Sequence, residues 1–116
     1  DPQNTRRAAT HLNCKDWIRF KLTGERLTDY TEASRSYLDA ATAEGFSFPL
    51  AKDLGQTELL DLLPEIRRSE EIGGYLTEEA SRRVGLPVGT PVGIGMLDIA
   101  VTGVGLGGRL MMETAG

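Results

Sequence analysis

Residues 77–98 read TEEASRRVGLPVGTPVGIGMLD, and this stretch decides the fold class. Thr77 can cap a helix, the two glutamates after it would lie at the positive end of the helix dipole, and Gly85 can close the helix in the left-handed conformation. A turn over residues 86–90 then leads to residues 91–97, an almost wholly apolar stretch of the kind that is buried on both faces of a parallel sheet. A helix followed by a buried strand is part of an alternating pattern, so the sequence predicts an α/β fold.

The rest of the chain alternates between helical and extended segments in the same way. We expect a first helix over residues 5–23 that is interrupted near Asn13 and stopped by Gly24. Pro64 ends a second amphipathic helix, over residues 50–63, because proline disfavours helical geometry in the residue before it. The other expected elements are a brief strand at 26–28, a capped turn at 29–34, a strand at 36–39 and extended segments at 65–69 and 71–76.

One face of the first helix is expected to be buried. Four apolar residues follow the spacing i, i+3, i+4 and i+8, which places them on one side of the helix: Cys14, Trp17, Ile18 and Leu22. Trp17 is interpreted as a core anchor and Cys14 as a small core residue. Because the charged residues of this segment fall mostly on the opposite side, the pattern predicts an apolar interface beneath the helix.

The composition excludes several classes of protein. The 116 residues include 13 Lys and Arg against 17 Asp and Glu, and the net charge of −4 argues against a nucleic-acid-binding module, which normally carries a basic patch. A single cysteine rules out an internal disulfide framework, and His11 is more simply structural or exposed than a metal ligand, so no metal site is predicted. No apolar run is long enough to span a membrane or to form a signal peptide. We therefore expect a soluble, cytoplasmic chain with no nucleic-acid or membrane partner.

Asp98 is the strongest candidate for chemistry. It is a lone carboxylate at the expected carboxyl end of a buried strand, where open α/β sheets place their ligand crevice. Gly93 and Gly95 before it remove side-chain bulk, so that a ligand or backbone can approach closely. On the pattern alone, the simpler reading of this aspartate is that it caps the helix that follows.

Three segments, taken in order, resemble the FGGY family of carbohydrate kinases. They are KDWIRFKLTGE and TDYTEASR within residues 15–35, LPEIRRS with two glycines and Leu-Thr within residues 63–77, and GLPVGTPV with GMLD and a glycine within residues 85–103. Each motif is weak by itself. Their shared order and spacing over nearly the whole chain make the resemblance specific.

The resemblance implies a two-domain sugar kinase with an actin-like, ribonuclease-H-like ATPase fold. Residues 1–116 would form the C-terminal half of the N-terminal, sugar-binding domain, and the second, ATP-binding domain would be absent from them. Such enzymes transfer the γ-phosphoryl group of ATP, with Mg²⁺, to a hydroxyl of a ketose or polyol. The resemblance makes Asp98 the general base and a substrate contact, a role that suits a carboxylate in phosphoryl transfer.

Two departures from the family pattern bear on substrate and cofactor. Residues 96–100, MLDIA, are more apolar than is usual in the family and closer to the branch that acts on L-xylulose. This departure favours a ketose as the substrate, and among ketoses a pentulose such as xylulose. Thr114 and Gly116 fall where the family has a phosphate loop and are the candidate cofactor-binding residues, although Glu113 replaces the first glycine expected there.

The resemblance also sets expectations for the isolated chain. We expect it to lack kinase activity and to bind ATP and Mg²⁺ weakly at most, because the nucleotide would lie between two domains. Its partners would be the sugar or polyol substrate and the rest of the kinase chain. The alternative is a non-enzymatic module of the same ancestry that self-associates through open sheet edges and apolar patches.

Overall fold

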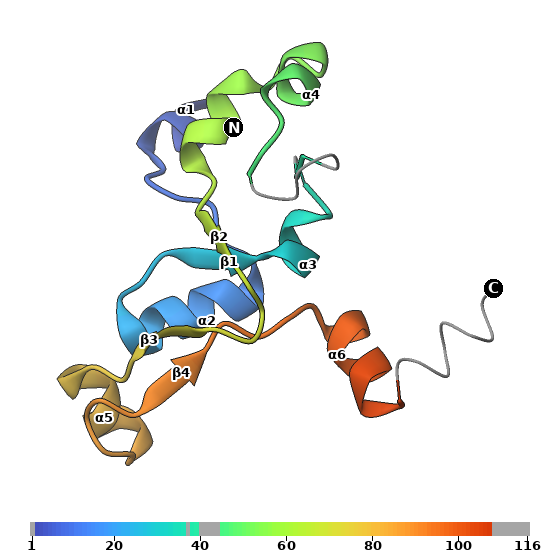
Figure 1. Cartoon of the computed structure of the whole chain (residues 1–116). Helices are drawn as coiled ribbons and strands as arrows, with labels where there is room; N and C mark the ends of the chain where they lie inside the picture. Colours follow the sequence, from blue (N-terminus) through green and yellow to red (C-terminus); the bar gives the residue numbers. More distant parts are fainter. Residues whose placement is uncertain (1, 37, 40–44, 108–116) are drawn as a thin grey trace.

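Short helices and strands alternate along the chain, and the computed structural model describes residues 2–36, 38–39 and 45–107 (Figure 1). The helices are α1 (Pro2–Arg7), α2 (Cys14–Thr23), α3 (Tyr30–Ala33), α4 (Phe48–Asp53), the 3-10 helix η1 (Thr57–Leu62), α5 (Glu78–Val84) and α6 (Asp98–Gly105). The strands are β1 (Leu27–Asp29), β2 (Glu65–Arg67), β3 (Ile72–Tyr75) and β4 (Pro91–Gly93).

The ends of α2 and α5 follow local signals, as predicted. α2 begins after Asn13, with residues 8–13 between it and α1, and ends at Gly24, whose φ of 77° lies in the left-handed region that glycine tolerates. α5 begins after Thr77, whose hydroxyl accepts a hydrogen bond from the Ala80 N–H at 3.2 Å, and ends at Gly85. The capped turn predicted at residues 29–34 is also confirmed, as α3.

The single helix predicted over residues 50–63 is wrong. Gly55 has a φ of 68° and interrupts the segment between α4 and η1, because a left-handed residue cannot continue a right-handed helix. In place of the strand predicted at residues 36–39, Leu38 forms an isolated antiparallel bridge with Phe46, and residue 37 lies outside the described residues.

The four short strands form two separate pairs. β1 and β2 run parallel, with Thr28 opposite Ile66, and α3, α4 and η1 lie between them in the chain. β3 and β4 run antiparallel, with Gly74 opposite Val92. A parallel pair connected through helices confirms the predicted α/β class.

The strand predicted over residues 91–97 is shorter than expected and differently paired. β4 covers only Pro91–Gly93, its partner strand is antiparallel, and its residues are exposed or half-buried instead of buried on both faces. Gly95, with a φ of 76°, turns the chain out of the extended conformation. Within this stretch Ile94 alone is buried, with 1% of its surface exposed.

α2 lies at the centre of the described structure, against β1, β3, β4 and α5 (Figure 1). The prediction of its buried face is wrong, because Trp17 is 52% exposed, Ile18 is 56% exposed and Cys14 is exposed. Neither Trp17 nor Cys14 is a core residue. The buried residues of α2 are Asp16, Arg19 and Thr23. The helix therefore turns its polar side inward, toward partners described below.

The apolar core of the described residues is small. Its members are Ala33, Ala51, Leu76, Ala80 and Ile94. The Cα radius of gyration is 16.4 Å, against about 13 Å for a compact domain of this length. α6 contributes to this extension, because it projects from the remaining elements and buries no residue (Figure 1).

Candidate functional site

A buried polar cluster lies between α2 and β1. Asp16 is fully buried, and its Oδ1 accepts hydrogen bonds from Lys15 Nζ at 2.8 Å and from Arg19 Nη1 at 3.0 Å. Its Oδ2 accepts a hydrogen bond from Thr28 Oγ1 of β1 at 2.7 Å. Both oxygens are satisfied, as a buried carboxylate requires. We call Lys15, Asp16, Arg19, Thr28 and Asp29 the buried polar cluster.

Asp29, the last residue of β1, supplies the second carboxylate of this cluster. Its Oδ2 accepts three hydrogen bonds, from Thr31 N at 3.0 Å, from Thr31 Oγ1 at 2.5 Å and from Ser69 Oγ at 2.8 Å. Its Oδ1 lies 3.1 Å from Lys15 Nζ in an ion pair, and accepts no hydrogen bond of good geometry within the described part of the chain. As the N-cap of α3, Asp29 fixes how the strand passes into that helix.

The surroundings shift the pKa values of two neighbouring carboxyl groups in opposite directions. Burial works to raise the pKa of Asp29, but the hydrogen bonds from Thr31 and Ser69 and the ammonium of Lys15 outweigh it and hold the pKa below its usual value. Burial raises the pKa of Glu32 on α3, and the negative charge of Asp16 adds to this effect. The structure therefore makes Asp29 easier to ionise, and Glu32 harder to ionise, than the same groups would be in the unfolded chain.

Residues 94–97, which lead from β4 to Asp98, are held first by α2. The carbonyl of Ile94 accepts hydrogen bonds from Arg19 Nη1 at 2.9 Å and from Lys15 Nζ at 3.3 Å. Both donors belong to the buried polar cluster, and Arg19 is only 3% exposed. Hydrogen bonds from charged donors are stronger than neutral ones, so this carbonyl has a well-defined position.

The same segment is held from two further directions. The Gly95 N–H donates to the Ser69 carbonyl, between β2 and β3, at 3.0 Å. The Leu97 N–H donates to Thr31 Oγ1, on α3, at 2.7 Å. Residues 94–97 thus make hydrogen bonds to α2, to α3 and to the connection between β2 and β3. We call residues 94–97 the anchored segment.

The structure places Asp98 at the end of the anchored segment, as the first residue of α6. Leu97 occupies the N-cap position that the capping hypothesis gave to Asp98, yet Asp98 Oδ1 accepts a hydrogen bond from the Ile99 N–H at 2.7 Å. The side chain is exposed. One oxygen thus binds the first turn of the helix, and the other is available to a ligand.

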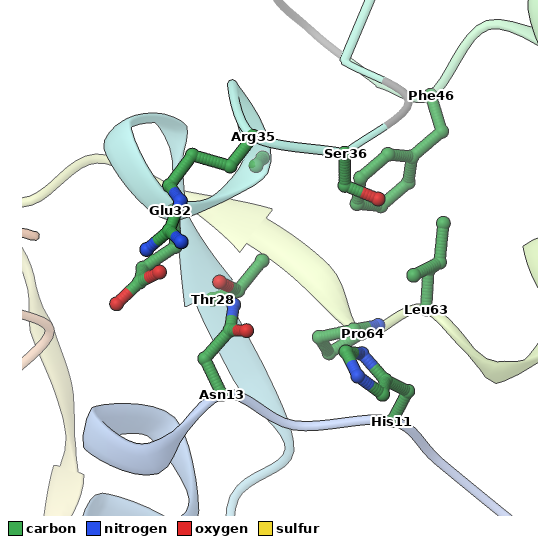
Figure 2. A pocket seen from close by; sticks show the side chains of 10 residues that line it. His11, Asn13, Thr28, Glu32, Arg35, Ser36, Phe46, Leu63 and Pro64 are labelled. Atoms are coloured by element: carbon green, nitrogen blue, oxygen red, sulfur yellow. The ribbon is translucent and has the colours of Figure 1, made fainter.

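Figure 2 shows a separate pocket of about 180 Å³ beside β1 and α3. Phe46, Leu63 and Pro64 form its apolar side, and Glu32 and Arg35 lie on the opposite side. Its other lining residues include His11, Asn13, Thr28 and Ser36. Asp98 does not line it, so the pocket and the candidate base are different features of the molecule.

The predicted cofactor residues Thr114 and Gly116 lie outside the described residues, as does Glu113. Among residues 2–36, 38–39 and 45–107, no group of His, Cys, Asp and Glu side chains could hold a metal ion. In the same part of the chain no helix has both the length and the apolar character needed to cross a bilayer.

The predicted site residues do not include Asp16, Asp29 or Thr31. The structure nevertheless connects these three, through hydrogen bonds and ion pairs, to the anchored segment that leads to Asp98. The sequence held one signal for two of them, because Asp29 and Thr31 form the Asp-x-Thr start of the capped turn. Asp16 gave no such signal. Its position on α2 is opposite the apolar stripe, where a charged residue is normally read as solvent-exposed.

Comparison with known proteins identifies the family. Residues 1–105 match the N-terminal domain of the FGGY family of carbohydrate kinases. The erythritol kinase of Brucella abortus is 37% identical over 106 residues, which cover 91% of this chain and 20% of that kinase. The probable L-xylulose kinase of Haemophilus influenzae is 34% identical over 102 residues, or 88% of this chain and 21% of that kinase.

Solved structures agree with these sequence matches. The crystal structure of xylulose kinase from Rhodospirillum rubrum matches 78% of this chain and 18% of its own, with a TM-score of 0.66 and 29% identity. The chain therefore spans about one fifth of the length of the relatives that it matches.

Proposed function

Because the chain belongs to the FGGY family of carbohydrate kinases, we propose that it is part of an ATP-dependent kinase that phosphorylates a hydroxyl of a small ketose or polyol. We assign residues 1–116 to the C-terminal half of the sugar-binding domain and place the ATP-binding domain elsewhere in the protein. The observation that carries the proposal is the exposed carboxylate of Asp98 at the end of the anchored segment.

In this proposal Asp98 is the general base. A sugar hydroxyl donates a hydrogen bond to the carboxylate oxygen that does not bind the Ile99 N–H, and loses its proton to that oxygen as it attacks. The bond from Ile99 keeps the carboxylate from rotating, so the accepting oxygen has a defined direction. Orientation of this kind is a major part of what a protein supplies to phosphoryl transfer.

ATP with Mg²⁺ would supply the phosphoryl group in the assembled kinase. Among the described residues, no group of His, Cys, Asp and Glu side chains could hold the Mg²⁺ by itself. Thr114 and Gly116 remain the candidate phosphate contacts of this chain. We therefore limit the role of the described residues to the sugar side of the reaction.

For the acceptor we favour a pentulose such as xylulose. Support comes from relatives named L-xylulose kinase and xylulose kinase and from the apolar residues beside Asp98. The relative named erythritol kinase makes a four-carbon polyol the main competitor.

The test uses the complete kinase that contains this chain, assayed for sugar-dependent ADP release with D- and L-xylulose, erythritol and glycerol. We expect Asp98→Asn to lower kcat by about 10²- to 10⁴-fold on the preferred sugar, the range for loss of a general base. Asp53→Asn, an exposed aspartate on α4, is the matched control and should retain wild-type kcat. Full activity of Asp98→Asn would show that the base has been assigned to the wrong residue.

The isolated 116-residue chain gives a second test. We expect no sugar-dependent ADP release from it, because the ATP-binding domain is proposed to lie elsewhere. Turnover by the purified chain would contradict the assignment of residues 1–116 to half of one domain.

A self-associating module is the second candidate, and the surface of α6 favours it. Ile99 is 78% exposed and Val104 is 64% exposed, on a helix that buries no residue. Apolar side chains left exposed on one helix offer a surface on which a second copy can bind. A sedimentation-equilibrium mass near 12.6 kDa at micromolar concentration would exclude this candidate for the chain itself.

A further inference from the structure

We propose that Thr31 is a positioning residue that sets the direction of the Asp98 carboxylate through a relay from Asp29 to Thr31 to the Leu97 N–H. The inference rests on the proposed function, in which Asp98 is the general base. It adds to that function a residue on α3, which lies 67 positions before Asp98 in the sequence.

The chemistry of the groups fixes the direction of each hydrogen bond in this relay. Thr31 Oγ1 lies 2.5 Å from Asp29 Oδ2 and 2.7 Å from the Leu97 nitrogen. An ionised carboxylate only accepts and a backbone N–H only donates, so the single hydroxyl proton must point to Asp29. A lone pair of the same oxygen then faces Leu97. The hydroxyl has no second arrangement that satisfies both neighbours.

Asp29 holds the first end of this relay in a fixed position. It is fully buried, and its Oδ2 also accepts hydrogen bonds from the Thr31 N–H and from Ser69 Oγ. The ion pair with Lys15 and these donors hold its pKa below the usual value, so it remains an acceptor at neutral pH. The Thr31 hydroxyl is therefore attached to a part of the fold that has little freedom to move.

The other end of the relay is the residue next to Asp98. Leu97 is the N-cap of α6 and has no side chain that could cap the helix. No hydrogen bond described for α6 itself reaches another element. The Leu97–Thr31 bond is thus the last described connection before the carboxylate, and the direction in which α6 leaves the anchored segment depends on it.

Thr31 could instead serve stability alone, and the two roles predict different kinetics. A residue that only stabilises the fold would lower the amount of folded kinase and leave kcat per folded molecule unchanged. A residue that orients the base would lower kcat while the KM for the sugar stays nearly constant, because the error lies in the geometry of the reacting groups.

The experiment compares three variants of the complete kinase. We expect Thr31→Val, which has nearly the same shape but no hydroxyl, to lower kcat by roughly 10- to 100-fold, the scale of a misplacement of about 1 Å. KM should change by less than about threefold, in keeping with a loss that is confined to the transition state. Thr31→Ser restores the hydroxyl and should restore kcat. Thr90→Val is the matched control, since Thr90 Oγ1 also bonds a backbone group, the Pro87 carbonyl, in the turn before β4.

A spectroscopic readout on the complete kinase checks the relay directly. In Thr31→Val we expect faster hydrogen exchange and a shifted resonance of the Leu97 amide, because that N–H loses its acceptor. Thr31→Ser and Thr90→Val should leave both unchanged. An unaltered Leu97 amide in Thr31→Val would overturn the proposal.

Ser69→Ala keeps the proposal testable if Thr31→Val does not fold. It removes one donor to Asp29 Oδ2 and leaves Thr31 intact, so we expect kcat to fall a few-fold at constant KM. Ser81→Ala, which removes an exposed hydroxyl bonded to the Leu86 carbonyl, is its control. Wild-type kcat in Ser69→Ala would contradict the relay.

The failures of the two proposals are distinguishable. If Asp98→Asn is fully active, the general base is wrong and the proposed function fails at that residue. If Asp98→Asn is inactive while Thr31→Val keeps its kcat, Asp98 remains the base and only the positioning role of Thr31 is overturned.

Discussion

Asp98 separates two regions that are held in opposite ways. The anchored segment before it makes backbone hydrogen bonds to Arg19, Ser69 and Thr31, which belong to three different parts of the chain. Helix α6 after it is rich in exposed apolar side chains and buries no residue. The difference indicates that the candidate base is positioned from its N-terminal side, where polar contacts and the buried side chain of Ile94 hold the chain.

The polar contacts that hold the anchored segment are themselves costly to maintain. Asp16, Asp29 and Arg19 have almost no exposed surface, and charges removed from water stabilise a protein only when each is fully paired. The loss of one partner should therefore matter far more here than any change on α6. The predictions below test that contrast, from the largest expected effect to the smallest.

Asp16→Asn should cause the largest loss of stability. It removes the carboxylate that pairs with Arg19, which is 3% exposed, and leaves that guanidinium charge buried. Breaking a buried pair in this way costs about 3–5 kcal/mol of unfolding free energy. Urea unfolding of the 116-residue chain, followed by circular dichroism, measures the difference. Asp53→Asn is the matched control, and a loss below about 1 kcal/mol for Asp16→Asn would contradict the importance of the buried pair.

Gly73→Ala tests the packing between α2 and the anchored segment. A Cβ at this position would lie 2.6 Å from Ile94 Cδ1 and 2.8 Å from Arg19 Cδ. Overpacking of this kind costs about 1–3 kcal/mol. Gly93→Ala on β4 is the control, because a Cβ there meets nothing within 4 Å. Equal unfolding midpoints in urea for the two variants would show that the side chains of Arg19 and Ile94 are not tightly packed around Gly73.

The two shifted carboxyl groups should give opposite dependences of stability on pH. The folded-state pKa of Asp29 is lowered, so its contribution is present above its unfolded value of 3.8 and is lost as the pH falls through the lowered pKa. The folded-state pKa of Glu32 is raised, so stability falls as the pH rises from 4.5 through the raised pKa. Glu32→Gln removes only the second effect.

Unfolding free energies measured for Glu32→Gln at pH 4 and pH 7 test this sign. We measure the unfolding free energy of the variant minus that of wild type at each pH. We expect this difference to be more positive at pH 7 than at pH 4, by about 1 kcal/mol or less, the size of most single substitutions. Glu58→Gln, an exposed glutamate on η1, is the control and should show no such difference. A relative gain at pH 4 would reverse the assigned direction.

Val104→Lys should have the smallest effect on unfolding. Val104 is 64% exposed on α6, so a charged side chain there should change the unfolding free energy by less than about 0.5 kcal/mol. If the apolar surface of α6 drives self-association, the same substitution should lower the weight-average mass in sedimentation. A destabilisation of several kcal/mol would mean that α6 packs in solution, and the contrast between the two sides of Asp98 would be lost.

Local signals in the sequence account for much of the fold. Thr77 and Gly85 set the ends of α5, Gly24 ends α2, and Asp29 caps α3, because caps and left-handed glycines act on the backbone within a few residues. The helix expected over residues 50–63 failed for the same kind of reason, since Gly55 was not recognised as a break.

The candidate site was only partly predictable. Asp98 stood out as a lone carboxylate, and its role as a base stays a prediction. The buried polar cluster could not be inferred from a helical pattern, because periodicity reports which residues share a face and not which face is covered. On α2 the apolar stripe that includes Trp17 faces outward.

The sequence by itself determined the family, the α/β class and the ends of most helices, because these depend on short motifs and on caps. Only the tertiary structure decided that Asp16 and Arg19 are buried and that the anchored segment is tied to α2 and α3. The physical reason is distance along the chain. Arg19 bonds the Ile94 carbonyl 75 residues away and Leu97 bonds Thr31 66 residues away, so the acceptors that make polar burial favourable come into place only when the chain folds.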